Sequence, residues 1–289
     1  MRRTLYLCQS RGIQVRVDGP SLWITQEGVA GRRVPFQMVE HAVILGNINL
    51  ETDVLSTLSE HNIPVTIFSR KGENTTMLVC YNEKFPPYYH KQKLFYRQPH
   101  GKNRYLNIVK HWRRKTEIYA LKRYSKKLFE KAKNENFKDG TFQKIIKSET
   151  LFLQDRYKMV YRLVRGLLCQ LILTQVRRAQ LDPSLGVIFR HHPHGLVLDI
   201  AYMLDPEVHL QTLRFFNKKG DEILITNIGV TSEGMRDIAL RFENRRASIT
   251  ELVRRVIGSI IEGIRDLEAK AEIRRTRRGV NERALPYML

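Results

Sequence analysis

The hydrophobic pattern of the chain changes near residue 80. Before that point, apolar residues occur in short runs rich in β-branched and aromatic side chains, such as Thr4–Leu7, Ile13–Val17 and Ser21–Thr25, which is typical of strands. A single helix pattern, Leu50–His61, precedes the further strand pattern Pro64–Phe68. Residues 1–82 therefore predict a small β-rich domain with one short helix.

The rest of the chain has helical periodicity. Residues 83–98 predict a linker, because Pro86-Pro87 and the neighbouring aromatic residues suit neither a strand nor a helix. From residue 99 to residue 289 the apolar positions recur at three and four residues, as on the buried face of a helix. The predicted fold class is α+β with two domains, the second of which is all-α.

The most informative stretch runs from Tyr161 to Arg214. Its first part is a broad apolar helical stripe, and Asp182-Pro183 ends that helix because proline has no N–H to donate. A second helix pattern begins near Val197, and Asp205-Pro206 predicts a new helix start. Beyond it, a helix that includes Phe242–Arg245 and a separate last helix from Ser248 to about residue 270 are predicted.

Charge narrows the class of partner. The chain has 50 Lys and Arg against 29 Asp and Glu, a formal net charge of +21, and a pI near 10.1. Such an excess predicts a polyanionic partner, most often nucleic acid. The strongest basic run lies on a long helix predicted from Tyr105 to Leu128. The candidate DNA-binding residues are Arg113, Arg114, Lys115, Lys122, Arg123, Lys126, Lys127, Arg177 and Arg178.

Cysteine usage and hydropathy point to a cytoplasmic protein. Cys8, Cys80 and Cys169 are far apart and match no zinc-binding spacing. An odd, sparse cysteine count fits a reducing compartment. Neither a signal-peptide pattern nor a run of about 18 apolar residues is visible, so no membrane span is expected.

The turn and the helix after it resemble the CRISPR-associated integrase family, the DNA-cutting subunit of spacer acquisition. That family has a Leu-Asp-Pro-x-hydrophobic-Gly turn, a metal-binding His, and a helix that begins Leu-x-Leu-Asp-Ile-Ala. Here Leu181–Gly186 and Leu196–Ala201 carry this frame. Ile44–Ile48, Ile63–Phe68 and Thr231–Gly234 are similar to further family segments, so the resemblance covers both ends and the middle of the chain.

The resemblance implies cutting and rejoining of phosphodiester bonds with a divalent metal held by a Glu, a His and an acidic residue. Asp199 aligns with the family's Leu-Asp pair, but Phe189 stands in place of the His and Tyr202 in place of the acid three residues after the Asp. We expect Phe189 and Tyr202 to pack where the ion would lie. Glu149 is the best candidate for the Glu, with Glu117 a weaker one.

Shifted ligands are the alternative. His191 and His192 follow the expected position by two and three residues, so a small slip of the loop would bring one of them into reach. An active site would then use Glu149, His191 or His192, and Asp199, with Mg²⁺ or Mn²⁺ as the ion. An exposed loop without a ligand role is the simpler interpretation of these histidines.

Three functions stay open. The first is a DNA-binding, catalytically impaired or inactive subunit of CRISPR spacer acquisition, an antiviral defence. The second is an active metal-dependent DNA endonuclease or integrase with shifted ligands, and the third is a generic basic nucleic-acid-binding protein. For the first two, the resemblance implies duplex or branched DNA, a homodimer formed by the β-rich domain, and a small ferredoxin-like adaptation partner (CRISPR-associated protein two).

Overall fold

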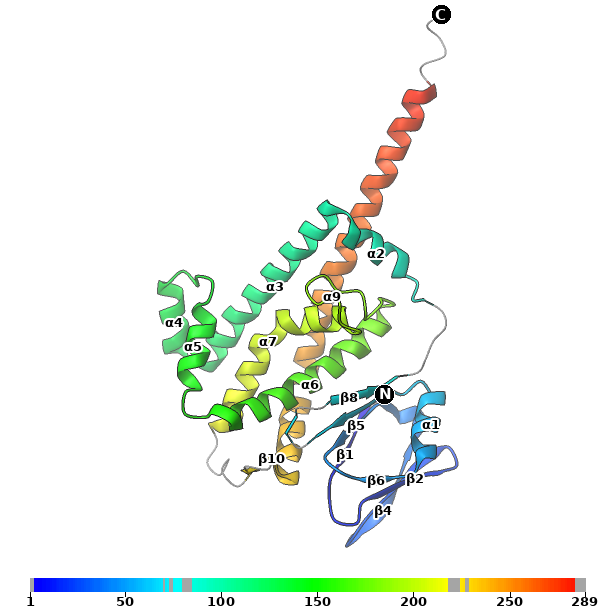
Figure 1. The fold of residues 1–289 in the computed structure, drawn as a ribbon, viewed down its shortest axis with the longest axis vertical. Coiled ribbons are helices and arrows are strands. Elements are labelled where there is room, and N and C mark those ends of the chain that lie inside the picture. The colour runs from blue at the N-terminus through cyan, green and yellow to red at the C-terminus, as the bar shows by residue number, and fades with distance from the viewer. Residues whose placement is uncertain are drawn as a thin grey trace, which may run out of the picture. The chain divides into compact units, whose positions relative to one another are not determined.

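The computed structural model describes residues 3–69, 71–72, 75–79, 85–217, 224–226 and 229–283. A strand-rich region is followed by a mostly helical one, which confirms the predicted α+β class (Figure 1). The chain forms two compact units, each built from three segments. The first unit contains Met1–Glu83, Glu117–Gln170 and Pro206–Ala247, and the second contains Lys84–Thr116, Leu171–Asp205 and Ser248–Leu289.

Two four-stranded sheets form the N-terminal part of the first unit. In one sheet β5 pairs in parallel with β1 and β7, and β8 closes the edge antiparallel to β7. In the other, β3 lies antiparallel between β2 and β4, and β6 pairs with β2 in parallel. The strands are β1 (Arg3–Cys8), β2 (Gln14–Asp18), β3 (Ser21–Gln26), β4 (Val29–Pro35), β5 (Val39–Leu45), β6 (Asn49–Leu50), β7 (Val65–Phe68) and β8 (Thr75–Leu78).

Alternating side chains explain how these strands form a core. On β2 and β3 the residues Val15, Leu22 and Ile24 are buried, while Arg16 and Trp23 beside them are more exposed. The inward residues join Ala42 and other apolar side chains from β1, β5, β7 and helix α1 (Thr52–Glu60) in one cluster. This core matches the strand and helix pattern predicted for residues 1–82.

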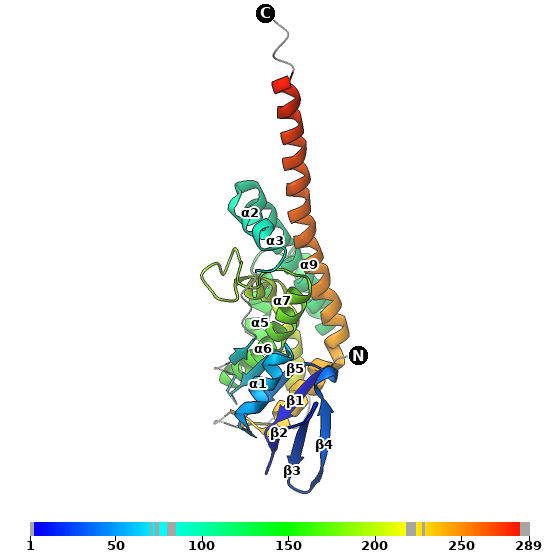
Figure 2. The ribbon, with the colours of Figure 1, turned by 90° about the vertical axis from the view of Figure 1, so that its right-hand side faces the viewer.

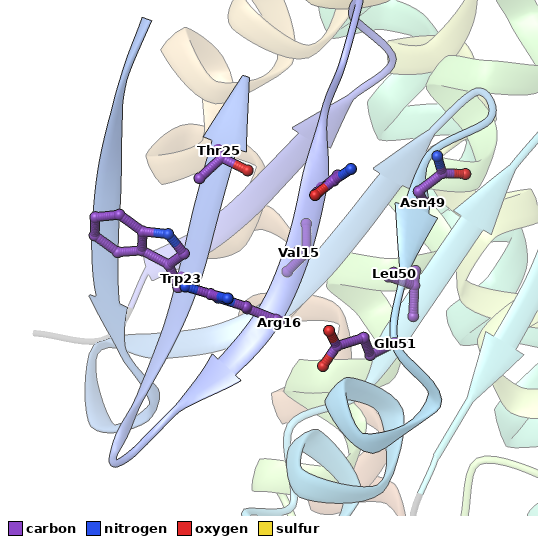
Figure 3. Close-up of a pocket in the computed structure, with 8 residues that line it drawn as sticks. Val15, Arg16, Trp23, Thr25, Asn49, Leu50 and Glu51 are labelled. Atoms are coloured by element: carbon purple, nitrogen blue, oxygen red, sulfur yellow. The ribbon is translucent and has the colours of Figure 1, made fainter. Parts of the chain in front are cut away.

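The outward face of the second sheet carries a hollow of about 470 Å³. Figure 3 shows its labelled side chains on β2, β3 and β6 and at the start of α1, among them Trp23, Arg16 and Glu51. The Trp23 ring lies so close over Gly31 of β4 that a Cβ there would come within 2.4 Å of it, and the Arg33 guanidinium lies 5.7 Å from the ring centroid. The result is a mixed polar and aromatic surface.

The helical part begins inside the segment predicted as a linker, since α2 occupies Tyr89–Arg97. The long basic helix ends at Tyr124, because the Ser125 backbone is extended and its hydroxyl accepts the Leu128 N–H, which caps the next helix. The helices that follow α2 are α3 (Pro99–Tyr124), α4 (Lys126–Asn134), α5 (Thr141–Glu149), α6 (Gln154–Arg178), α7 (Gly195–Phe216) and α9 (Ser232–Arg283), with a short hairpin of β9 (Ile225–Thr226) and β10 (Gly229–Val230) before α9.

Two predicted helix boundaries are wrong. Asp205-Pro206 does not start a helix, because α7 continues through Pro206. A new helix at Ser248 is also absent, since α9 runs unbroken from Ser232 to Arg283 (Figure 2). The residues between the two expected segments, Arg246 and Ala247, both favour helix and offer no break.

Helix α6 is the apolar helix predicted from sequence. It is long and apolar enough to cross a membrane by composition, but 72% of the relevant window is buried inside the protein, as in a core helix. Cys169 within it is buried, whereas Cys80 lies outside the described residues. In the first unit, α6 approaches β7 so closely that a Cβ at Gly166 would lie 2.1 Å from the Phe68 ring.

Polar contacts also fix the first sheet within the first unit. Tyr6 donates from its hydroxyl to Glu243 Oε1 of α9 over 2.7 Å, and Arg246 donates to the same oxygen over 2.9 Å. The fully buried His41 lies with Nε2 2.8 Å from Thr66 Oγ1. Burial, with a smaller effect from Arg246, lowers the pKa of His41 to about 3.

Replacement of Gly166 by alanine should destabilise the protein. The added Cβ would overlap the Phe68 ring, and overpacking of this kind costs about 1–3 kcal/mol. Gly258 is the matched control, because it is also helical but a Cβ there meets nothing within 4 Å, so Gly258→Ala should be neutral or slightly stabilising. Thermal unfolding followed by circular dichroism tests this; equal midpoints for the two variants would contradict it.

Buried His41 predicts acid-sensitive stability. Because its folded pKa is lowered to about 3 and an unfolded histidine titrates near 6.5, the unfolded chain binds the proton first as the pH falls. The contribution of His41 to stability is therefore complete above about pH 6.5 and decreases toward pH 3, by at most about 1.4 kcal/mol per pH unit. The melting temperature of His41→Gln should fall less than that of the wild type between pH 7 and pH 5. Melting temperatures of wild type and His41→Gln that fall equally with pH would refute His41 as the origin of the acid sensitivity.

Candidate functional site

Asp199 is at the centre of the second unit. It lies in the second turn of α7 and is fully buried. Its Oδ2 accepts hydrogen bonds from the Tyr105 hydroxyl over 2.8 Å and from the backbone N–H groups of Val187 and Ile188 over 2.7 and 3.3 Å. Its Oδ1 accepts the N–H of Phe189 over 3.0 Å. Four protein donors thus surround both oxygens.

Tyr105 suits this donor role. It is fully buried on α3, and burial, the nearby Tyr96 and the Asp199 carboxylate raise the pKa of its phenol well above the ordinary value. The hydroxyl therefore keeps its proton and donates a hydrogen bond to the Asp199 carboxylate. A charge-assisted bond of this kind is stronger than one between neutral groups.

A second polar cluster shapes the turn before α7. The buried Gln92 of α2 donates from Nε2 to the carbonyl oxygens of Asp182 and Leu185, each over 3.1 Å, and its Oε1 accepts the Asp182 N–H over 2.9 Å. Asp182 Oδ1 in turn accepts the N–H and the hydroxyl of Ser184, as in an Asx turn. The Asp-Pro turn is therefore held from both sides.

Two glycines let the loop between the turn and α7 close on itself. A Cβ at Gly186 would lie 2.4 Å from the Gly195 carbonyl carbon, and a Cβ at Gly195 would lie 2.8 Å from the carbonyl oxygens of Ser184 and Phe189. Side chains at either position would push the backbone apart. The loop geometry that aims the three amides at Asp199 thus depends on this close approach.

The two positions where the sequence departs from the resembled pattern have different surroundings. Phe189 is half-buried and holds its backbone N–H on Asp199. Tyr202 is 40% exposed. The Arg113 guanidinium lies 4.9 Å from the Tyr202 ring centroid.

Arg113 also supplies a hydrogen-bond donor that the backbone of α7 lacks. Pro206 has no N–H, so it cannot donate to the Tyr202 carbonyl oxygen four residues earlier. Arg113 Nη1 donates to that oxygen over 2.7 Å and to Asp205 Oδ2 over 3.1 Å. The bonds that hold Arg113, whose own exposure is only 9%, make its role structural.

The histidines lie on the exposed loop before α7. His191 Nε2 is 2.9 Å from Arg190 Nε, and His192 Nδ1 accepts the His194 N–H over 3.0 Å. Both rings are exposed. Each therefore has one nitrogen occupied within the loop itself.

Glu149 and Glu117 belong to the first unit, unlike Asp199, His191 and His192. Glu149 is exposed at the last position of α5, and its Oε2 accepts the Tyr124 hydroxyl over 3.1 Å. Burial and this carboxylate raise the pKa of Tyr124. Glu117 is half-buried on α3.

These residues do not fit a bound divalent ion. Mg²⁺ and Mn²⁺ need several oxygen ligands in near-octahedral geometry. Asp199 already has four donors on its carboxylate, and position 189 has no ligand atom in its side chain. Across the part of the chain that the structure describes, no group of three or more His, Cys, Asp or Glu side chains is placed to hold a metal.

The predicted DNA-binding cations separate into two kinds. Arg113 is tied to Asp205, and Arg123 lies 3.9 Å from the buried Glu207 and against the Tyr119 ring. The others are exposed or half-buried on α3, α4 and the end of α6: Arg114, Lys115, Lys122, Lys126, Lys127, Arg177 and Arg178. This second group can meet phosphates without breaking an internal ion pair with Asp205 or Glu207.

Sequence reasoning missed Gln92 and Tyr105. Gln92 fell in a segment predicted as a linker, and Tyr105 marked only the start of a basic helix. Both are fully buried polar residues, which helical periodicity cannot tell apart from apolar ones. A polar side chain on the apolar stripe of a helix was the available signal, since such a group needs a buried partner.

Comparison with known proteins agrees with the resemblance found in the sequence. The family model for CRISPR-associated protein Cas1 matches residues 6–146. A Cas1 protein from Thermotoga maritima has a TM-score of 0.71 at 16% identity, covering 91% of this chain and 97% of that one. A casposase bound to integration product has a TM-score of 0.62 at 17% identity, covering 84% and 82%. No curated protein matches the sequence.

A third similar structure is a Cas6-RT-Cas1–Cas2 complex, with a TM-score of 0.71 at 15% identity. It is matched over 92% of this chain but 35% of that larger chain. The family model covers just under half of the chain, and the similar structures share its fold; both agree with the resemblance to the CRISPR-associated integrase family. The family's nucleases are metal-dependent.

Asp199→Ala should destabilise the protein whether or not metal is present. It leaves three backbone N–H groups and the Tyr105 hydroxyl without their acceptor, and each buried donor so stranded costs about 1–3 kcal/mol. A large fall in melting temperature, identical in EDTA and in Mn²⁺, is expected. The exposed Glu149→Gln serves as the control and should melt like the wild type.

A stability loss at Asp199 that appears only in Mn²⁺ would show instead that its carboxylate serves a bound ion.

Proposed function

We propose that this chain is a DNA-holding Cas1-family subunit of CRISPR spacer acquisition whose phosphodiester-cutting site is degenerate. The observation that carries the proposal is the Asp199 carboxylate, which four protein donors surround. The carboxylate that aligns best with the family's metal site is thus part of the fold. With Phe189 and Tyr202 beside it, the second unit has lost the acid and the imidazole that the family pattern places there.

DNA binding does not need that metal. Phosphate contacts come from cations, and the exposed lysines of α3 and α4 offer them along a continuous stretch of chain. Such contacts position DNA without reading its sequence. Two of the similar structures, the casposase with integration product and a Cas1–DNA complex, hold DNA on the same fold, which supports duplex or branched DNA as the ligand.

The proposed function includes assembly with other proteins. The two-sheet N-terminal region of residues 1–82 is the proposed dimerisation domain. Its outward face, with Trp23 beside the hollow (Figure 3), offers an aromatic and polar surface suited to a second protein. The Cas2 component of one similar complex supports a small adaptation partner of that kind. The cytoplasm is the proposed location.

The reaction itself is tested with the purified full chain on duplex and branched DNA, with Mg²⁺ or Mn²⁺. We expect binding without nicking or strand transfer. Metal-dependent cutting that Glu149→Gln removes would restore the active-enzyme alternative, because that exposed carboxylate makes a single hydrogen bond with Tyr124 and its loss should spare the fold. Equal affinity for RNA and DNA would favour the generic nucleic-acid-binding alternative.

Charge reversal tests the location of the DNA. Lys122→Glu/Lys126→Glu should weaken DNA binding at least tenfold and flatten the salt dependence, since each lost phosphate contact lowers the slope of log K against log salt by about 0.9. The matched control is Lys133→Glu/Lys158→Glu, whose lysines already pair with Glu130 and Asp155. Both variants lower the net charge of +21 by four, to +17. Equal losses would mean that net charge alone drives binding.

A further inference from the structure

Tyr202 is an aromatic side chain held at the surface. The residues on either side of it in α7, Ala201 and Met203, are buried, while Tyr202 remains 40% exposed. Large aromatic side chains usually bury their rings, because they gain the most from leaving water. The exposed Tyr202 ring, at the position where the resembled pattern has an acidic residue, is therefore a candidate for binding a ligand.

The ring is also rigidly supported. Arg113 lies against it, with the guanidinium 4.9 Å from the ring centroid. Arg113 is itself fixed by Asp205 and by the main-chain oxygen that Pro206 leaves without a helical donor. Little side-chain entropy is then lost when a ligand stacks on the ring, which favours binding.

A second exposed apolar side chain lies on the loop that is bound to α7. Tyr202 follows Asp199 by three residues, so the two lie on neighbouring positions of one helix face. Asp199 binds the N–H of Ile188, and the Ile188 side chain is 41% exposed. Asp199 thus ties the loop that carries Ile188 to α7, one helical turn before Tyr202.

The charge around this surface favours nucleic acid over an apolar protein partner. Lys110 is exposed three residues before Arg113 on α3, and Arg190 is exposed two residues after Ile188 on the loop. Cations that can meet phosphates beside an aromatic ring are the combination with which proteins bind single-stranded nucleic acid. A duplex would hide its base faces, whereas an unpaired base exposes them.

We propose that Tyr202, backed by Arg113 and flanked by Ile188, is a stacking site for an unpaired nucleobase in branched DNA. This proposal rests on the DNA-holding function above. Stacking reads no sequence, because every base has a π-face. The position that binds metal in the family pattern would here grip a single-stranded segment instead of cutting it.

The test uses forked DNA with 2-aminopurine, a fluorescent base that is quenched by stacking, placed at successive positions of the single-stranded arm. Wild type should quench it at a restricted set of positions. Tyr202→Ala should abolish that quenching and weaken binding of forked DNA about 5- to 150-fold, the equivalent of 1–3 kcal/mol per stacked base. Affinity for fully paired duplex should not change, and Tyr202→Phe should behave like wild type.

Tyr119→Ala is the matched control, since Tyr119 is 43% exposed and also packs against an arginine, Arg123. It should retain the quenching. Three results would overturn the stacking site. Tyr202→Ala could leave quenching and affinity for forked DNA unchanged, or Tyr119→Ala could lose them to the same extent. An equal loss of affinity for duplex in Tyr202→Ala would also overturn it. A wild-type chain that binds none of these DNAs would instead refute the DNA-holding function.

Discussion

The second unit depends on one buried carboxylate. Without Asp199, the amides of residues 187–189 and the Tyr105 hydroxyl have no acceptor, and the loop that joins the Asp-Pro turn to α7 loses its anchor. The close contact of Gly186 with Gly195 brings the loop near enough for these bonds. The Asp199 carboxylate therefore works as an internal hydrogen-bond hub, and a hub of this kind stabilises only when every donor is matched.

The proposed function separates two properties, the holding of DNA and the cutting of DNA. Holding a nucleic acid requires exposed positive charge on stable helices, and α3 and α4 supply it. Cutting it requires a set of oxygen and nitrogen ligands that converge on one point. The first property survives changes at single positions because it is spread over many residues, whereas the second is lost when one or two ligands change.

The strand and helix pattern was largely predictable, because apolar alternation at Val15, Leu22 and Ile24 and the stripe of α6 reflect burial directly. The helix boundaries at Pro206 and Ser248 were not, since local rules cannot report that Arg113 replaces the missing proline donor or that nothing interrupts α9. The sequence singled out Asp199, Phe189 and Tyr202, and their roles stay predictions. The partners of Asp199 were not predictable, because Tyr105 is 94 residues away along the chain and its buried hydroxyl leaves no local mark in the sequence.

The proline in α7 has one more consequence. The tie between α3 and α7 uses the main-chain oxygen of residue 202 as acceptor, and a main-chain oxygen is present whatever side chain the residue carries. Exchange of an acidic residue for an aromatic one at this place would therefore leave the tie between the two helices intact. A main-chain tie of this kind allows the side chain at position 202 to change while the fold around it stays in place.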